Sequence, residues 1–166
     1  MIARDSEHVL KFVTDGMLGK LTRWLRMLGH NVKYANNIDD RLLIKIAKTE
    51  KRTLLTRDVE LYQQATTKNT ETFLVEGKNE AERLANLSKR FNLKLELNPD
   101  NSRCPKCNTK IKLAKKTEIA DKIPLSTKIF YEEFWECPKC GKIYWQGAHW
   151  KKINKTLKEA KRLLAK

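Results

Sequence analysis

The stretch that decides the fold is Val9-Leu-Lys-Phe-Val-Thr-Asp-Gly-Met-Leu-Gly-Lys-Leu-Thr-Arg-Trp-Leu-Arg-Met-Leu-Gly29. Its first residues are mostly apolar and lead into Thr14-Asp15-Gly16, which indicates a short strand followed by a turn. Residues 17–28 then place leucines at helical spacing, and Gly29 is a typical helix stop. The stretch therefore predicts one strand, one turn and one helix.

The same order of elements recurs down to about residue 91. Further strands are expected at residues 31–35, 52–56 and 73–75. Helices are expected from Asp39-Asp40, after Arg57-Asp58, and from Asn79-Glu-Ala-Glu82, which has the form of a capping box. Strand and helix in alternation predict an α/β fold with a parallel sheet and helices on its faces. Because the sequence has neither a glycine-rich nucleotide loop nor a P-loop, no nucleotide cofactor is expected.

The chain is strongly basic, and the excess is uneven. Its 166 residues carry 35 Lys and Arg against 20 Asp and Glu, a net charge of +15. Residues 1–98 hold a net +5, whereas residues 99–166 hold a net +10. Such a field attracts polyanions, of which nucleic acid is the commonest inside cells. The alternative is an ordinary lysine-rich solvated surface.

The sequence gives no sign of a membrane or export. No run approaches the roughly 18 apolar residues that a membrane span needs. Met1-Ile-Ala-Arg-Asp5 lacks the apolar region of a signal peptide. We therefore expect a soluble cytoplasmic protein without a membrane partner.

All four cysteines lie in two matched pairs, Cys104-Pro-Lys-Cys107 and Cys137-Pro-Lys-Cys140, separated by 29 residues. Two C-x-x-C turns supply the tetrahedral thiolate set that Zn²⁺ prefers, as in a zinc ribbon. Two disulfides, or a thioredoxin-like redox pair, are the alternatives; disulfides are rare inside the cell, and a redox motif would not occur twice. Because four thiolates fill the shell, the zinc is expected to be structural.

Short apolar runs around the cysteines predict the strands of the ribbon: Lys128-Ile-Phe-Tyr131, Phe134-Trp135 and Ile143-Tyr-Trp145. Trp145 and Trp150 either stack on RNA bases or cover the ribbon core. His149 is expected to make a polar contact rather than to act as a fifth ligand. Residues 151–166 predict a basic amphipathic helix, packed on the protein or lying along RNA. The predicted units are 1–98, 99–150 and 151–166.

Function in an open parallel sheet gathers at the carboxyl ends of its strands. Asp15 follows the first strand and Asp58 the third, while Asp39 or Asp40 opens the helix after the second. Three carboxylates at one edge form an oxygen-ligand site suited to Mg²⁺ or Mn²⁺, ions that support displacement at a phosphodiester. Each also has an ordinary interpretation, as a turn residue for Asp15 or a helix N-cap for the others.

The helix at residues 17–28 carries a basic stripe. Leu18, Leu21, Leu25 and Leu28 share one face, and Lys20, Arg23 and Arg26 occupy the other. A polar outer face is usual for a surface helix. Three cations without an acid are less usual and would suit phosphate groups.

These motifs resemble the Mut-seven C-terminal RNase domain family, PIN-like nucleases with an appended zinc ribbon. The resemblance runs from about Val9 to Trp150 and includes Leu54-Leu-Thr-Arg-Asp58, Ser102-Arg-Cys-Pro-Lys-Cys-Asn108 and Cys137-Pro-Lys-Cys-Gly-Lys-Ile-Tyr-Trp-Gln-Gly-Ala-His-Trp150. It implies a PIN-like fold and metal-dependent ribonuclease activity. By the same resemblance Asp15, Asp40 (or Asp39) and Asp58 are the metal-binding acids, and Lys20, Arg23 and Arg26 the basic positions. PIN-like nucleases often have a fourth acid, for which Glu60 is the candidate in this sequence.

The sequence thus predicts an endoribonuclease for structured RNA, ribosomal or transfer. Asp15, Asp40 and Asp58 would be catalytic with Mg²⁺ or Mn²⁺. Phosphates would be bound by four cations: Lys20, Arg23, Arg26 and Arg57. The main alternative is a factor that binds RNA or the ribosome without cleaving it. A DNA-binding zinc protein is disfavoured because no recognition helix with base-reading residues is evident.

Overall fold

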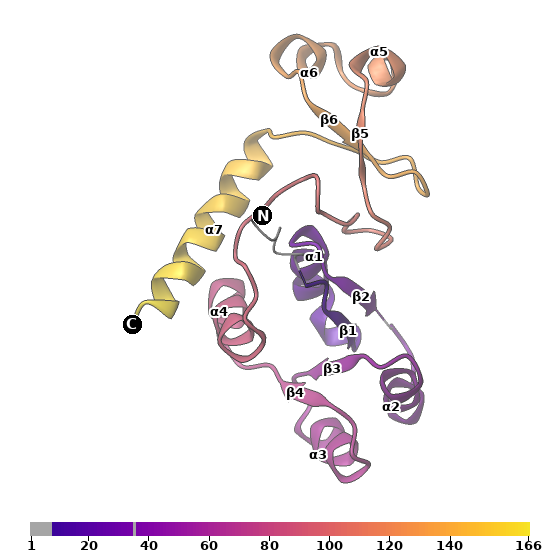
Figure 1. Ribbon diagram of the computed structural model, residues 1–166, viewed down its shortest axis with the longest axis vertical. Helices are drawn as coiled ribbons and strands as arrows, with labels where there is room; N and C mark the ends of the chain where they lie inside the picture. The colour runs from indigo at the N-terminus through magenta and orange to yellow at the C-terminus, as the bar shows by residue number, and fades with distance from the viewer. Residues whose placement is uncertain (1–7, 35) are drawn as a thin grey trace, which may run out of the picture.

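The computed structural model describes residues 8–34 and 36–166. Its larger sheet has four parallel strands in the order β2-β1-β3-β4 (Figure 1). These strands are β1 (Lys11–Thr14), β2 (Asn31–Tyr34), β3 (Thr53–Thr56) and β4 (Thr72–Leu74). The predicted parallel sheet is confirmed. Ala35, the expected end of the second strand, and Met1–Asp5, the subject of the signal-peptide prediction, lie outside the described residues.

Helices cover both faces of this sheet. They are η1 (Gly16–Leu18), α1 (Gly19–Met27), α2 (Asp40–Thr49), α3 (Val59–Thr67) and α4 (Glu80–Phe91). Successive strand residues point to opposite faces. Phe12 and Leu55 therefore pack in one core with α1 and α4, and Val13 and Leu54 pack in another with α2 and α3. The result is a three-layer α/β domain.

Local signals fix several helix ends as predicted. The Asn79 side chain accepts a hydrogen bond from the Glu82 N at 3.0 Å, and the Glu82 carboxylate accepts one from the Lys78 N at 2.7 Å. Gly29 follows α1 with a φ of +97°, and a Cβ there would lie 2.8 Å from the Asn101 carbonyl oxygen. Only glycine satisfies both the backbone angle and the close approach.

A second, antiparallel sheet has the order β5-β6-β7. Its strands are β5 (Lys112–Ala114), β6 (Phe134–Glu136) and β7 (Ile143–Tyr144). The strands predicted at Phe134-Trp135 and at residues 143–145 are thus found, whereas β5 was not expected. We call residues 102–147, which contain this sheet and the four cysteines, the ribbon.

The strand predicted at Lys128–Tyr131 is wrong. Between β5 and β6 the chain forms α5 (Lys116–Ile119), η2 (Ala120–Lys122) and α6 (Leu125–Phe130). A short apolar run does not distinguish strand from helix, and Pro124 is preset for a helix start. The apolar residues that suggested a strand are also not in a core, since Ile129 is 65% exposed and Phe130 is 77% exposed.

The basic tail forms α7 (Ala148–Leu164), which runs back beside α4 (Figure 1). Leu157 and Ala160 are buried in the same core as Phe12, and Lys161 pairs with Glu96 at 3.2 Å. Of the two alternatives, the helix is therefore packed on the protein. The division at residues 98 and 150 stays a prediction, although this shared core joins α7 to the larger sheet. Among the described helices, none is long and apolar enough to span a membrane.

Candidate active site and metal centre

Asp15 lies directly after β1, at the carboxyl edge of the larger sheet, and is only 8% exposed. Its Oδ1 accepts a hydrogen bond from the Met17 N at 2.9 Å, so Asp15 caps η1. Its Oδ2 accepts a hydrogen bond from the Thr56 hydroxyl at 2.7 Å. Asp15 is therefore a turn residue, as its ordinary interpretation predicted. Its second carboxylate oxygen also makes a contact with the neighbouring strand β3.

Thr56, which the sequence did not single out, joins Asp15 to Asp58. Its buried hydroxyl donates to Asp15 and accepts a hydrogen bond from the Asp58 N at 3.0 Å. Asp58 Oδ1 accepts hydrogen bonds from the backbone N of Glu60 at 2.9 Å and of Leu61 at 3.2 Å, so it caps α3. Because both bonds use Oδ1, the other oxygen of this exposed carboxylate is left for another ligand.

The two adjacent aspartates after β2 have different surroundings. Asp39 is exposed, and its Oδ1 caps α2 by accepting a hydrogen bond from the Leu42 N at 2.8 Å. Asp40 is half-buried in the first turn of α2. Partial burial and then the charges of Asp58 and Asp15 raise the pKa of Asp40 above its ordinary value. The charge of Asp39 also raises the pKa of Asp40, so Asp40 lies in the field of all three other aspartates, while Asp39 in addition caps α2.

The residue types at this edge fit a divalent cation. Within the described residues, the ion pairs do not involve Asp15, Asp40 or Asp58, so their charges are not neutralised by a cationic side chain in contact. In the same part of the chain, only the cysteines form a metal-ligand group of three or more within 4.8 Å. The structure therefore does not bring Asp15, Asp40 and Asp58 together as one set of ligand atoms, and a Mg²⁺ ion at this edge would take one or two of the carboxylates and complete its shell with waters or substrate oxygens.

Exposed apolar side chains border the acids. Met17 in η1 is 70% exposed and Val59 in α3 is 54% exposed, and both stand in the first turn after a sheet strand. Tyr34 and Leu42 are exposed at the same edge. Sequence periodicity gave no signal for them, because single apolar residues on helix ends are common. Gathered beside carboxylates, they are an apolar rim suited to contact with a ligand.

The predicted basic stripe is only partly exposed. Lys20 and Arg23 on α1 and Arg57 after β3 are exposed. The placement of Arg26 on the open face is wrong, since it is only 8% exposed. Its guanidinium donates to the Val32 carbonyl at 2.8 and 3.0 Å and to the Pro105 carbonyl at 2.9 Å. Arg26 is therefore occupied by the protein, because the ribbon covers this side of α1.

The four cysteines converge, and none is disulfide-bonded. The Cys104 and Cys140 sulfurs are 3.7 Å apart, and those of Cys107 and Cys137 are 3.4 Å apart. A tetrahedral zinc site with Zn–S bonds of 2.3 Å places its sulfurs about 3.8 Å apart. The cluster therefore fits a zinc ion in which all four ligands come from the protein.

The two cysteine turns have matching backbones. The Asn108 N donates to the Cys104 carbonyl at 2.8 Å, and the Gly141 N donates to the Cys137 carbonyl at 2.9 Å. Asn108 and Gly141 have φ values of 70° and 76°, the left-handed region that asparagine and glycine tolerate. Repetition of this geometry supports one metal site built from two equivalent halves.

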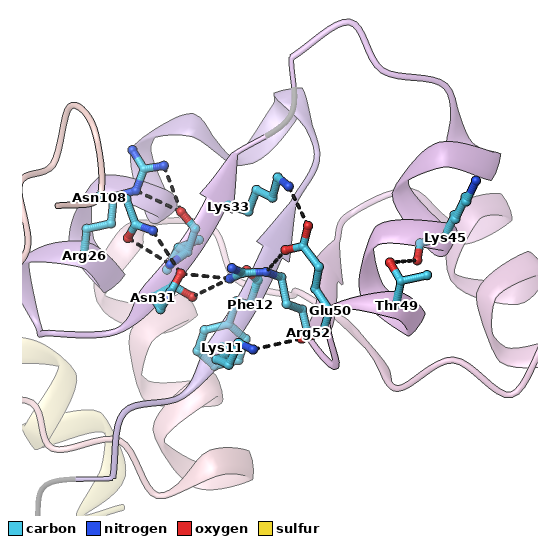
Figure 2. A network of polar contacts seen from close by, with 11 residues as sticks. Lys11, Phe12, Arg26, Asn31, Lys33, Lys45, Thr49, Glu50, Arg52 and Asn108 are labelled. Atoms are coloured by element: carbon cyan, nitrogen blue, oxygen red, sulfur yellow. Dashed lines mark hydrogen bonds and ion pairs between the residues drawn. The ribbon is translucent and has the colours of Figure 1, made fainter.

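A polar network fastens the first cysteine turn to the larger sheet (Figure 2). Asn108 Oδ1 accepts a hydrogen bond from the Val32 N at 3.0 Å, and its amide donates to Asn31 Oδ1 at 2.9 Å. Asn31 Oδ1 also accepts a hydrogen bond from Arg52 at 2.9 Å. Together with the Arg26 bonds, these contacts tie the ribbon to the start of β2 and the end of α1.

The acids and the ribbon are at opposite ends of the larger sheet. Asp15 and Asp58 follow the carboxyl ends of β1 and β3, whereas the ribbon contacts Asn31 and Val32 at the beginning of β2. A four-residue strand spans about 13 Å. The cysteine cluster therefore lies too far from the carboxylates to share a ligand atom with them.

Comparison with known proteins gives one match, to a family model described as the Mut7-C RNAse domain, over residues 10–157. The chain belongs to this family. No curated protein and no solved structure matches it significantly. The predicted Mut7-C resemblance is thus confirmed, and the matched residues include the carboxyl-edge acids, the four cysteines and the first part of α7. Membership in an RNase domain family gives the chain an RNA-related role.

Proposed function

We propose that this Mut7-C protein is a metal-dependent endoribonuclease that cleaves structured RNA of the cytoplasm, ribosomal or transfer. The observation that carries the proposal is the joining of Asp15 and Asp58 through Thr56, with Asp40 inside their field. Mg²⁺ or Mn²⁺ held by these carboxylates would supply activation of water and stabilisation of charge on the scissile phosphate.

The remaining residues at this edge would position the substrate. Hydrogen bonds fix both oxygens of Asp15 before any ligand arrives, which reduces the reorganisation that cleavage requires. Lys20, Arg23 and Arg57 are exposed and would neutralise phosphates on either side of the cleaved bond. The apolar rim, with Met17 as its most exposed member, would contact sugars and bases.

The adjacent aspartates provide a matched pair of variants. Asparagine caps a helix as well as aspartate, so Asp39→Asn should keep the cap of α2 and the cleavage of labelled RNA in Mn²⁺. Asp40→Asn and Asp15→Asn should lose cleavage by at least about a hundredfold, the scale of losing a charge-stabilising group. Asp121→Asn in the ribbon is the remote control. Equal activity, or equal inactivity, of wild type and Asp15→Asn would refute the nuclease proposal.

A second candidate is a factor that binds RNA or the ribosome without cleavage. Its support is the charge distribution, because the net +10 of residues 99–166 lies mainly in the ribbon and α7, away from the acids. This candidate predicts salt-sensitive co-sedimentation with ribosomal subunits that is unchanged by Asp15→Asn. Release of cut RNA after addition of Mn²⁺ to the sedimented complex would favour the nuclease instead.

We also propose that the cysteine cluster holds a structural Zn²⁺. Four thiolates complete the tetrahedral shell, so no position is left for a reacting ligand. The Tyr144 hydroxyl lies 3.0 Å from the Cys104 sulfur, and burial raises the pKa of Tyr144, so it keeps its proton to donate. Native mass spectrometry should find one zinc per chain in the wild type and none in a Cys104→Ser, Cys137→Ser variant.

A further inference from the structure

A cleft of about 720 Å³ lies between the ribbon, the segment after α4 and the start of α7. Pro99 and Arg103 line it on one side, and Ile143 of β7 and Ile153 of α7 line it on others. Ligand-binding cavities in proteins commonly have volumes of roughly 300–1,000 Å³. The cleft is separate from the carboxyl edge, because Met27, the last residue of α1, is part of its wall.

The walls of this cleft are unusually aromatic: Tyr131, Trp135, Tyr144, Trp145 and Trp150. Part of this set is structural. Trp135 is 3% exposed and donates to Asp100 Oδ1 at 3.1 Å. Tyr131, Trp145 and Trp150 are only half-buried and keep ring surface for a ligand. Three of the four tryptophans of the chain thus line one cavity.

One half-buried ring is held in place by its neighbours. Trp145 packs on Phe134 with ring centroids 6.3 Å apart. A Cβ on Gly147 would lie 2.9 Å from the Trp145 indole nitrogen, so a side chain at this position would displace the ring. A fixed, partly open ring is a ready stacking surface, since little conformational entropy is lost when a second ring binds.

The surroundings of the cleft are cationic. Lys142 lines it and is exposed, and Lys151 and Lys152 directly follow Trp150 and are exposed. These cations belong to the segment with the net charge of +10. Lys142 lies over the Tyr144 ring, 5.8 Å from its centroid. Aromatic rings among cations complement a chain of planar bases linked by phosphates, whereas a purely apolar ligand would make no use of the exposed lysines.

We propose that this cleft binds an unpaired nucleobase of an RNA chain, with the lysines around its mouth holding the adjacent phosphates. The inference rests on the RNA-related role of the family, but not on cleavage. It assigns the ribbon a recognition task that the four-thiolate metal site cannot perform. The proposal also sets a minimum distance between the bound base and the cleaved bond, because the cleft and the acids lie at opposite ends of the larger sheet.

That distance constrains the substrate. The strands of the sheet separate the two sites by at least about 13 Å. Stacked nucleotides advance about 3.4 Å each along a strand. An RNA that occupies both sites and stays stacked between them therefore has roughly four or more nucleotides between the bound base and the cleaved bond.

The test measures RNA binding by the zinc-loaded full chain without added Mg²⁺ or Mn²⁺, so that cleavage plays no part. The probe is a fluorescein-labelled single-stranded RNA of about 12 nucleotides, within the site sizes of single-strand binders. Trp150→Ala should weaken binding by about 5- to 150-fold, the effect of losing one stacked base. The slope of log affinity against log salt should not change, because no charge is removed. Trp150→Phe should restore most of the affinity.

Two controls distinguish the loss of base stacking from a loss of folding in the Trp150→Ala variant. Phe130→Ala removes an aromatic ring that is 77% exposed on α6 and outside the cleft, and it should bind like the wild type. The same RNA annealed to its complement offers no free bases, so Trp150→Ala should leave duplex binding unchanged. Equal losses for single-stranded and duplex RNA would assign Trp150 a structural role and overturn the proposal.

Two measurements need no removal of an aromatic residue. Single-stranded RNA should quench tryptophan fluorescence of the wild type, and Ala148→Leu, which narrows the cleft, should weaken both binding and quenching. An acidic peptide that competes as well as RNA at equal charge would show that the cleft selects charge rather than bases, and would overturn the proposal. Binding is measured without Mg²⁺ or Mn²⁺ and cleavage is measured separately, so failure here and failure of the nuclease proposal are distinguishable.

Discussion

Replacing Arg26 with methionine should weaken the attachment of the ribbon to the larger sheet, which the Asn108 contacts still hold, without altering the carboxyl edge. Methionine keeps much of the side-chain length and is a good helix former, so α1 is preserved. The substitution removes the donors to the Val32 carbonyl in β2 and to the Pro105 carbonyl in the first cysteine turn. It therefore tests whether zinc binding and the stability of the sheet are coupled.

The loss of stability can be calculated from the three short hydrogen bonds of the Arg26 guanidinium. Each net hydrogen bond contributes about 0.5–1.5 kcal/mol, so their loss should lower the free energy of unfolding by about 3 kcal/mol. For a chain of this length, this corresponds to a fall in Tm of about 6–12 °C. Of these three bonds, only the one from Arg26 to Pro105 reaches the cysteine turn, so the coupling between Arg26 and zinc should be about 1 kcal/mol.

Urea denaturation of wild type and Arg26→Met, each with zinc and after chelation, completes a thermodynamic cycle. Removal of zinc should cost the variant less than it costs the wild type, because the contact it disturbs is already lost. Arg23→Met, an exposed neighbour on α1, should change stability by less than about 0.5 kcal/mol. Equal zinc effects in wild type and Arg26→Met, within 0.5 kcal/mol, would refute the coupling.

Three further predictions concern pH and the acids. Burial, followed by the charges of Arg103 and His8, lowers the pKa of His30 to about 4. Because only the unfolded His30 takes up a proton as pH falls from about 6.5 toward 4, acidification from pH 7 to pH 5 should cost about 2 kcal/mol of stability in urea titrations. His30→Gln should remove that loss, and exposed His149→Gln should retain it. Asp40 has a raised pKa, so protons should displace Mn²⁺ at a higher pH than from an ordinary aspartate. Calorimetric titration with Mn²⁺ from pH 7 to pH 4 should show this, with a shallower pH dependence in Asp40→Asn. Thr56→Val should cost about 1–3 kcal/mol in urea, because it leaves Asp15 and the Asp58 N without their shared partner, and should slow RNA cleavage. Thr49→Val, exposed on α2, should do neither.

Local patterns were enough to predict most of the fold. The four strands are separated by helices with clear starts and stops, such as Gly29 and the Asn79 cap, and parallel order follows from that alternation. The edge position of Asp15 and Asp58 followed in turn, since each comes directly after a strand. The cysteine cluster was predictable because each pair is a local turn whose geometry its own sequence fixes.

Contacts between distant segments were not predictable in the same way. A helical wheel places Arg26 opposite the leucines and so predicts that it is exposed. Arg26 is buried only because the ribbon packs against this face of α1. Thr56 looked like an ordinary strand residue until β1 and β3 lay side by side. The wrong strand at Lys128–Tyr131 came from apolar residues that the structure leaves in solvent, where hydrophobicity no longer reports a core.

The return of α7 to α4 has a consequence for the order of events during synthesis. Leu157 and Ala160 complete the core around Phe12, yet they leave the ribosome after the entire ribbon. The residues of the larger sheet are therefore synthesised first, but its core is completed last. The cysteines are synthesised before α7 and can meet zinc before this helix packs on the sheet domain. A shortened chain that ends between residues 148 and 156 would contain the whole ribbon beside a sheet that still lacks part of its interior.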